Sequence, residues 1–384
     1  MSPRRPTVYD VAERAKVSIA TVSFAFSRPD QISVATRERV LETARELGYM
    51  PSASARGLAR GRTGALGLHS FDLLIDRPLQ REPADPDASV ETAAVATPYA
   101  PGRTFIPWDD AGEIAADPRA FPLYVDEVRR GFELECRAHD RPVMLSRGSD
   151  TTTAVAESAG RVDGLAIFPG PSAAASLKRV SLAMPIVLFS YPPADDGHHR
   201  VTSDNAGGAR ELVRHLVVEH GITDLGFVGA TSVGDYRERF QGYRDALAEL
   251  GVTADDEVLD DTVLGEGSGF GGVIEALRAG RLPRALVCAS DQLALALVDL
   301  LRTEGVDVPG DVVVTGFDGI LAGLLATPRL TTVRQPMEAM GRAAARILID
   351  TTTGTQPGEP VTLRLGTKLV VRESCGCRGL RPRS

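Results

Sequence analysis

Residues 6–28 read PTVYDVAERAKVSIATVSFAFSR, and they have the pattern of two short helices joined by a tight turn. Thr7 stands where the N-cap of a helix would be, and the expected first helix has small or apolar residues on one face: Val11, Ala12 and Ala15. Ser18 can cap a second helix over residues 19–26. Such a pair predicts a helix-turn-helix, whose second helix can enter the major groove of DNA.

The sequence after this stretch strengthens the prediction. Ser33 can cap a third helix over residues 34–47, and the chain continues GYMPSASARGLARGRTGALGL. Together these residues resemble the headpiece of the lac-repressor (LacI/GalR) family of bacterial transcription regulators. That family's pattern, TxYDVAxxAxVSxxTVS…VSxxTRxRVxxxAxxLGYxPxxxARxLxxxRT, is nearly all present. The resemblance continues through the rest of the chain, apart from one long insertion.

The resemblance implies which headpiece residues would contact DNA. Base contacts would come from Ile19, Ala20 and Phe24, and phosphate contacts from Thr7, Tyr9, Ser23, Ser33 and Thr36. The expected DNA-binding set also includes Ser18, Thr21 and Tyr49. Phe24 departs from the arginine that many members carry, and it can offer thymine methyls only apolar contact. A core aromatic under the helix is the alternative role for Phe24.

Residues 52–59, SASARGLA, occupy the position of the family's hinge helix. The resemblance implies that Leu58 is levered between base pairs in the minor groove, with Ala55 packing beside it. Gly57 costs a free helix about 1 kcal/mol relative to alanine, so we expect the segment to order on DNA. A plain linker would also fit the composition.

The charge of the chain is divided unevenly along its length. Residues 1–62 contain eleven Lys or Arg and six Asp or Glu, a net of +5, whereas the whole chain carries −8 and the remainder therefore −13. A basic headpiece on an acidic body places the attraction for phosphate at one end of the protein.

The chain has 384 residues, which predicts two or three domains. No run is apolar and long enough to span a bilayer, and the N-terminus lacks the apolar core of a signal peptide. Four cysteines make no disulfide framework. We therefore expect a cytoplasmic, nucleoid-associated protein with no membrane partner and no cofactor.

Residues 64–372 are expected to form the body. Strand and helix patterns alternate, which predicts parallel sheets covered by helices. We expect strands at 64–75, 142–146, 163–168, 185–190, 224–229, 258–264, 284–289, 312–317 and 369–372, and helices at 123–138, 205–219, 236–250 and 292–303. The resemblance implies an α/β, two-lobed body like type I periplasmic-binding proteins, with three crossovers and a small molecule between the lobes.

Residues 76–120 interrupt this body with seven prolines and net negative charge, which predicts a largely disordered insertion. A partner-docking loop is the alternative for this insertion.

The motifs of the body point to a ligand site. SDNAGGARELVRHL (203–216), DYRERFQGYRDAL (235–247), CASDQLALALVDLL (288–301) and GFDG (316–319) resemble family segments. The expected effector-binding residues are Asp204, Arg237 and Asp291, because two carboxylates and a guanidinium can bind the hydroxyl groups of a sugar. Helix caps and a surface cation are their alternative roles. Leu264 stands where some sugar-responsive relatives have a tryptophan, which leaves the sugar class open.

Residues 373–384 end the chain as ESCGCRGLRPRS. Cys375 and Cys377 suggest a metal, but two thiolates fall short of the four ligands of a structural zinc site and no histidine is near in sequence. We therefore expect an exposed tail and no metal. The absence of a leucine heptad after residue 372 removes support for a coiled-coil tetramer, so we expect a homodimer.

The sequence thus predicts four parts: a helix-turn-helix domain (1–50), a hinge helix and linker (51–63), an effector-binding and dimerisation domain (64–372) and a tail (373–384). The expected function is a transcription regulator that acts as a repressor, binds a palindromic double-stranded operator and responds to a sugar or sugar derivative. A solute-binding protein and a response to a non-sugar metabolite are the alternatives. We find no nucleophile–base motif and no phosphate loop, which argues against an enzyme.

Overall fold

The computed structural model describes residues 6–27, 29–49, 62–71, 124–148, 158, 160–168, 184–191, 196–253, 255–263, 269–355 and 359–377. The chain divides into two compact units, Met1–Gly64 and Ala65–Ser384. We refer to them as the headpiece and the body and describe each by itself. The predictions for Ala55 and Leu58 in the hinge, for the insertion at 76–120, for Leu264 and for the last seven residues lie outside the described residues.

The headpiece contains the three predicted helices. They are α1 (Val8–Ala15), α2 (Ile19–Ser27) and α3 (Val34–Leu47), with a short 3-10 turn, η1 (Pro29–Gln31), before α3. The predicted caps are confirmed. The Thr7 backbone N–H donates to Asp10 Oδ2 at 2.6 Å, and Ser18 Oγ accepts from the Thr21 N–H at 3.1 Å. Ser33 Oγ accepts from the Thr36 N–H at 3.3 Å.

Small and β-branched side chains fill the headpiece core. Its buried members are Val11, Ala12, Ala15, Val22, Ala25, Val40 and Ala44. The small side chains let α1, α2 and α3 approach closely, and Phe26 meets Tyr49 edge-on at the margin with ring centroids 6.1 Å apart. The core therefore uses the inner faces of all three helices.

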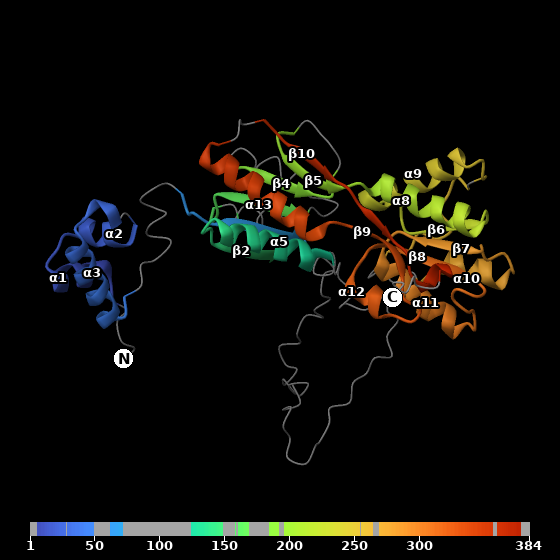
Figure 1. The fold of residues 1–384 in the computed structure, drawn as a ribbon, viewed down its shortest axis with the longest axis horizontal. Helices are drawn as coiled ribbons and strands as arrows, with labels where there is room; N and C mark the ends of the chain where they lie inside the picture. The colour runs from blue at the N-terminus through green and yellow to red at the C-terminus, as the bar shows by residue number, and fades with distance from the viewer. Residues whose placement is uncertain are drawn as a thin grey trace, which may run out of the picture. The chain divides into compact units, whose positions relative to one another are not determined.

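The body is built on two sheets (Figure 1). The first has the order β10-β5-β4-β3-β1-β2, and its strands are β1 (Leu66–Phe71), β2 (Val143–Gly148), β3 (Gly164–Phe168), β4 (Ile186–Phe189), β5 (His199–Ser203) and β10 (Thr362–Leu365). The second has the order β11-β9-β8-β7-β6, and its strands are β6 (Leu225–Val228), β7 (Ala285–Cys288), β8 (Val313–Asp318), β9 (Thr331–Arg334) and β11 (Lys368–Val370). All neighbouring strands are parallel except β11 and β9.

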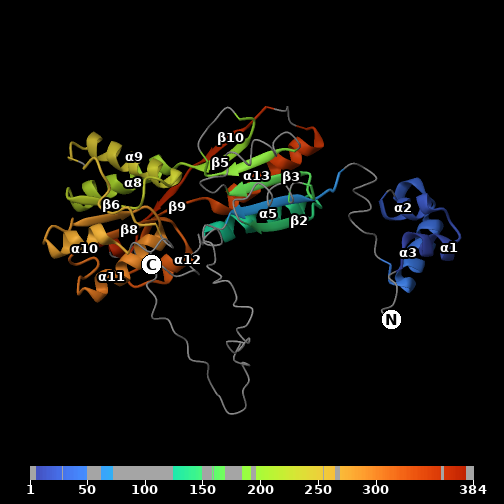
Figure 2. The ribbon, with the colours of Figure 1, turned by 180° about the vertical axis from the view of Figure 1, so that it is seen from behind.

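Helices cover these sheets as the alternation predicts. In the first lobe, α5 (Tyr124–Ala138) and α13 (Met337–Thr353) pack against each other and against the sheet. In the second lobe, α8 (Asn205–Arg214) and α9 (Gly234–Glu249) lie on one side of the sheet. α10 (Gly271–Arg278) and α11 (Asp291–Thr303) lie on the other side (Figures 1 and 2). The π-helical turn η3 (His215–Glu219) continues α8, and α12 (Leu321–Leu325) and the 3-10 turn η4 (Glu373–Cys375) are short.

The chain passes between the sheets three times, which confirms the predicted crossovers. It leaves the first sheet after β5 and returns to it as β10 by way of β9 and α13. It then crosses again from β10 to β11. None of the helices in the described ranges is both apolar enough and long enough to cross a bilayer.

Three expectations are corrected. Within residues 255–263, the strand predicted near 258–264 is reduced to a single bridge between Asp260 and Val228. The expected elements also did not include β5, β9, β10, α10, α12 and α13. For β5 the reason is that it contains His199, Arg200 and Thr202, whose polar side chains hide a fully buried strand. The predicted exposed tail is wrong for its first residues, since Cys375 is 1% exposed and packs in the core of the second lobe.

Two glycines allow α5 and α13 to touch backbone to backbone. A Cβ at Gly341 would overlap the carbonyl oxygen of Val128, and a Cβ at Gly131 would overlap that of Glu338. Because backbone atoms cannot rotate away as side chains can, neither position has room for alanine. This contact fixes the pairing of the two helices over the first sheet.

We predict that Gly341→Ala lowers the free energy of unfolding by about 1–3 kcal/mol or more, as overpacking of a close contact does. Gly271→Ala is the matched control, because Gly271 is also helical and nothing lies within 4 Å of its Cβ position. That change should leave stability unchanged or raise it by up to about 1 kcal/mol through helix propensity. Thermal unfolding followed by circular dichroism measures both, and equal melting temperatures for the two variants would contradict the packing account.

Candidate functional site

Helix α2 presents small and polar residues on its outer face. Ile19 is 43% exposed, and Ala20 and Ser23 are exposed as well. Ser18, exposed at the start of the helix, caps it. Thr21 is half-buried, and its hydroxyl lies 2.9 Å from that of Ser18. The predicted recognition helix therefore offers a surface that a major groove can accept.

Phe24 is half-buried, and within the described headpiece it is not among the apolar side chains that pack on the core. Phe26 holds that place instead. Phe24 is therefore not part of this core, and its contact with DNA stays a prediction.

Of the predicted phosphate-contacting residues, all but Ser23 lie at the N-terminal ends of helices. Thr7 and Ser33 are the N-caps of α1 and α3, and Tyr9 is 67% exposed on the first turn of α1. Thr36 and Tyr49 are half-buried. A helix N-terminus is a favourable place for phosphate, because its free N–H groups and dipole attract anions.

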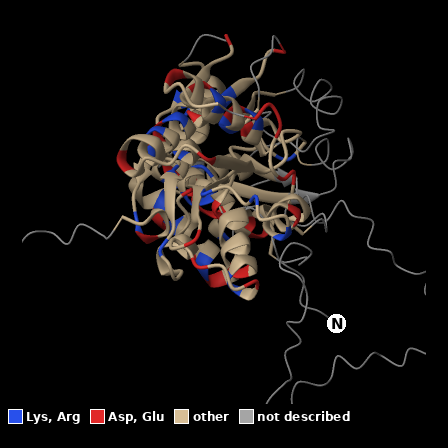
Figure 3. Cartoon of the chain, turned by 90° about the vertical axis from the view of Figure 1, so that its right-hand side faces the viewer, with Lys and Arg blue, Asp and Glu red and all other residues tan. Residues whose placement is uncertain are grey.

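Charged side chains of the body are mixed by sign. Along the ribbon in Figure 3, Lys and Arg positions (blue) are interspersed with Asp and Glu positions (red). The separation of charge is therefore one along the sequence: residues 1–62 are net basic, and the remainder of the chain is net acidic.

The body contains a buried polar cluster centred on Arg239, whose side chain is 3% exposed. Its Nε donates to Asn205 Oδ1 at 2.9 Å, and its Nη1 donates to the Ala289 carbonyl oxygen at 2.5 Å. Nη1 is also 3.3 Å from Asp318 Oδ1, and Nη2 is 3.8 Å from Asp235 Oδ2. These partners come from four different places in the lobe, namely α8, the end of β7, the end of β8 and α9.

Polar side chains extend this network, which we call the Arg239 cluster. Its members are Asn205, Asp235, Glu238, Arg239, Asp318 and Gln335. Asn205 Nδ2 donates to Asp235 at 3.1 Å and to Glu238 at 3.2 Å. Gln335 Nε2 donates to Asp318 Oδ1 at 2.7 Å. The guanidinium of Arg239 also lies 3.9 Å from the centroid of the Phe317 ring, a cation–π contact.

The first lobe reaches the same cluster through two serines. Ser203, at the end of β5, donates from its hydroxyl to Gln335 Oε1 at 2.6 Å. Ser190, just after β4, hydrogen-bonds to Asp235. The carboxyl ends of the parallel strands of both sheets therefore meet here, which is where α/β sheets hold ligands.

Burial shifts the titration of the cluster's acids. It raises the pKa of Asp318 to about 7, an effect that Arg239 partly offsets, and it also raises the pKa of Asp235. The cause is that a carboxylate loses its hydration in the interior, which favours the protonated form. A cluster of such carboxyl groups around one guanidinium can accept hydrogen bonds from hydroxyl groups and donate one in return.

The three residues predicted to bind an effector have different surroundings. Asp204 is the N-cap of α8 and accepts from the Gly207 N–H at 3.1 Å. Asp291 is fully buried and accepts from the Ile320 N–H at 2.8 Å and from the Thr332 hydroxyl. Burial raises its pKa to about 6, and its charge in turn raises the pKa of Asp318.

Arg237 is exposed, and its Nε donates to the Thr231 carbonyl oxygen at 2.9 Å. Arg239 was not among the residues expected from the sequence, and the structure places it in the buried cluster. On a helix, residues 239, 243 and 246 share one face, and Tyr243 and Ala246 are buried. That spacing was the available signal, because it places Arg239 on the inner face and Arg237 on the outer one.

Two family models match the chain. Residues 7–52 match the lacI family of bacterial regulatory proteins, and residues 213–375 match a periplasmic binding protein-like domain. The second match includes most of the Arg239 cluster.

Curated relatives extend over nearly the whole chain. The transcriptional regulator CelR of Thermobifida fusca is 32% identical over 375 residues, which is 97% of this chain and 98% of that protein. The regulator Rv3575c of Mycobacterium tuberculosis is 32% identical over 403 residues (98% and 99%). GalR of Escherichia coli is 29% identical over 345 residues (89% and 88%).

Solved structures share the architecture. A CelR–cellobiose complex is 28% identical, covers 96% of this chain and 100% of that one, and has a TM-score of 0.62. The Lac repressor dimer bound to operator and the anti-inducer ONPF is 22% identical, covers 97% and 99%, and has a TM-score of 0.74, which shows the common fold.

The helical headpiece and the two-sheet body agree with the relatives, which are transcriptional regulators. This chain therefore belongs to the lacI family of bacterial regulatory proteins, and it is a DNA-binding transcriptional regulator with a periplasmic-binding-protein-like effector domain.

Proposed function

We propose that this regulator binds a palindromic operator as a homodimer, acts as a repressor, and is controlled by a small polyhydroxylated molecule bound at the Arg239 cluster. The observation that carries the proposal is the meeting of strand ends from both lobes on a buried guanidinium and two carboxyl groups. Operator binding would take place in the cytoplasm, at the nucleoid. One headpiece reads a half-site, which is the reason to expect a dimer and a palindrome.

The chemistry of the cluster suits a carbohydrate. Neighbouring hydroxyl groups of a sugar both donate and accept hydrogen bonds, so they can satisfy carboxylates and a guanidinium together. The CelR relative was solved as a complex with cellobiose, which makes cellobiose the first candidate to test. A non-sugar metabolite rich in hydroxyl groups is the second candidate class.

Contacts between the lobes offer a way for the ligand to act. Arg334 at the end of β9 forms a two-pronged ion pair with Glu127 of α5, with Nη1 3.1 Å from Oε1, and this pair links the second lobe to the first. A ligand changes the DNA-bound population only through unequal affinity for two lobe arrangements. A ligand held at the Arg239 cluster would contact both lobes and so sense their arrangement.

Gel-shift experiments test the proposal in two stages. Selection from a random DNA pool should yield a palindrome, and a set of sugars that includes cellobiose should then be screened for release of that DNA. A selected sequence without two-fold symmetry would contradict the dimer. Release by no hydroxyl-rich compound would contradict the effector class.

We predict that Leu58→Ala weakens binding to the selected operator by a few kcal/mol at most, because it removes the expected minor-groove wedge. Binding to unrelated DNA depends on phosphate contacts and should barely change. Both affinities should be measured at one salt concentration. Equal losses on the two DNAs, or no loss on either, would show that Leu58 is not the wedge.

We also predict that Arg239→Lys weakens the response to the effector while Arg237→Ala does not. Lysine keeps the charge but lacks the planar fork of donors that holds Asn205 and the carboxyl groups. The effector concentration for half-release of operator should rise about tenfold, equivalent to about 1.4 kcal/mol.

Arg237→Ala is the matched control, because that side chain is exposed on the same helix. Operator affinity without effector and melting temperature should be recorded for both variants, so that loss of fold is distinguished from loss of ligand. Loss of the response in Arg237→Ala, with the response kept in Arg239→Lys, would return the role to Arg237 and contradict the assignment made from burial.

A further inference from the structure

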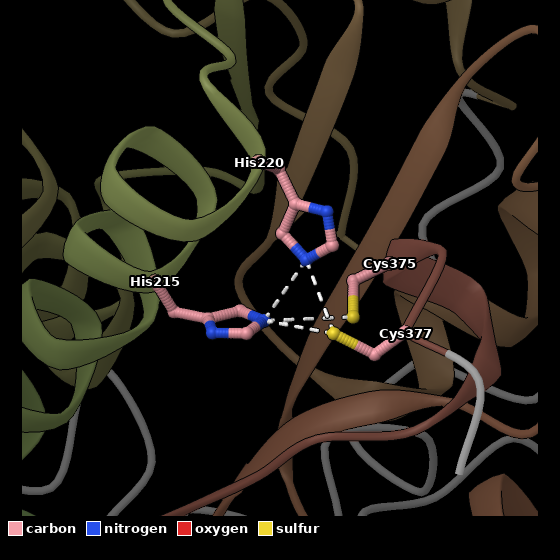
Figure 4. A group of neighbouring side chains, drawn as sticks. All are labelled: His215, His220, Cys375 and Cys377. Atoms are coloured by element: carbon pink, nitrogen blue, oxygen red, sulfur yellow. Dashed lines mark hydrogen bonds between the residues drawn. The ribbon is translucent and has the colours of Figure 1, made fainter.

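Four side chains with metal-binding atoms meet in the second lobe (Figure 4). None of them is a member of the Arg239 cluster. We call them the Cys–His cluster, and its members are His215, His220, Cys375 and Cys377. Their ligand atoms all lie within 4.8 Å of one another. The histidines belong to the end of α8 and the cysteines to the segment after β11, so about 150 residues separate the two pairs in sequence.

Four distances between ligand atoms of the cluster lie within about 0.4 Å of those in a tetrahedral zinc site. With Zn–S near 2.3 Å and Zn–N near 2.0–2.1 Å, a tetrahedron places sulfur about 3.6 Å from nitrogen and two nitrogens about 3.3 Å apart. His215 Nε2 lies 3.6 Å from Cys375 Sγ and 3.7 Å from Cys377 Sγ. His220 Nε2 lies 3.2 Å from Cys377 Sγ and 3.2 Å from His215 Nε2.

The π-helical turn explains how both histidines reach one point. In an α-helix, residues five apart point in different directions. The chain from His215 to Glu219 forms a π-helix, whose wider turn brings residue i+5 back over residue i. The two imidazole rings lie nearly perpendicular, at 79°, with both Nε2 atoms directed at the cysteines (Figure 4). Such turns are rare and recur at functional sites.

A left-handed glycine does the same for the cysteines. Gly376 has φ of +90°, a conformation that other residues rarely adopt, and it turns the chain so that the thiols on either side of it face the histidines. The segment is also anchored firmly. Ser374 Oγ donates to the Val314 carbonyl oxygen at 2.6 Å and accepts from the Thr331 N–H at 2.9 Å.

The sulfur of Cys375 is held in a defined polar setting. It is buried, and the Thr331 hydroxyl donates to it at 3.1 Å. The Cys375 thiol also lies 3.3 Å from the Arg372 carbonyl oxygen. A divalent cation would balance two thiolates with no net charge left in the interior, and it would replace the contact between two imidazole nitrogens with two coordinate bonds.

We propose that the Cys–His cluster binds one Zn²⁺ ion as a closed, structural site. Two thiolate and two imidazole ligands in a tetrahedron form a donor set typical of structural zinc. Binding releases the two thiol protons. All four positions are filled by protein, so the site has no place for a substrate.

The ion would clamp the end of the chain onto α8. Cys375 lies on η4, which is bound to β8 and β9 through Ser374 and Thr331, whereas the histidines end the helix that begins with Asn205 of the Arg239 cluster. A zinc ion would therefore fix the position of α8 relative to the second sheet.

The full chain, purified without added metal, should contain one zinc per chain by elemental analysis. A strong chelator should remove the metal and lower the melting temperature, and Zn²⁺ alone should restore it. Replacement by Co²⁺ should give the intense visible absorption of tetrahedral cobalt with thiolate-to-metal bands in the near ultraviolet. A weak, octahedral cobalt spectrum would overturn the proposal, as would zinc that is far below stoichiometry and lost on dialysis.

Variants separate the cluster from other thiols and imidazoles. Cys377→Ser and His220→Ala should each lose most of the zinc. The matched controls Cys136→Ala and His139→Ala should keep it, because Cys136 lies on α5 and His139 directly follows that helix, in the other lobe. Zinc retained by the cluster variants would overturn the proposal. So would a Cys375–Cys377 disulfide, seen as a loss of two hydrogens in the proteolytic peptide that carries both cysteines. If a cluster variant fails to fold, the cobalt spectrum of the wild-type chain still decides.

Discussion

A guanidinium buried inside the second lobe is the constraint around which the body is arranged. Placing Arg239 in the interior is costly unless every donor finds an acceptor. The acceptors come from the start of α8, the end of β7 and the end of β8, so these chain segments must converge. Burial raises the pKa of Asp318 and of Asp235, and the single positive charge of Arg239 offsets this rise only in part. The site is therefore rich in acceptors.

The same constraint ties the lobes to each other. Gln335 donates to Asp318 and accepts from Ser203 of the first sheet, and Glu127 of the first lobe pairs with Arg334 next to it. Residue 334 ends β9, where the chain crosses toward α13. Polar contacts at a crossover can rearrange with less disturbance than a packed core, so a ligand here is well placed to bias one lobe arrangement. Under the proposed function, such a ligand would couple the Arg239 cluster to DNA binding.

Much of this could be predicted from the sequence, and the exceptions have physical causes. The headpiece helices and their caps follow from local spacing, so Thr7, Ser18 and Ser33 were placed correctly. Buried apolar strands such as β3 and β4 are evident in the sequence, whereas β5 was missed because its buried residues are polar. The family segment at 235–247 indicates Arg237 as a ligand contact, whereas helical periodicity places Arg239 on the buried face of α9. The Cys–His cluster depends on a π-helical turn and on contact between distant segments, neither of which local patterns reveal.

The account's central claim is that the effector is held at the Arg239 cluster. A crystal structure of the full chain with the compound that releases operator DNA tests it most directly. The account predicts ligand hydroxyl groups within hydrogen-bonding distance of the Arg239 guanidinium and of the Asp235 or Asp318 carboxyl group, with at least one further contact from the first lobe. A ligand bound elsewhere, with the Arg239 cluster unchanged, would contradict it.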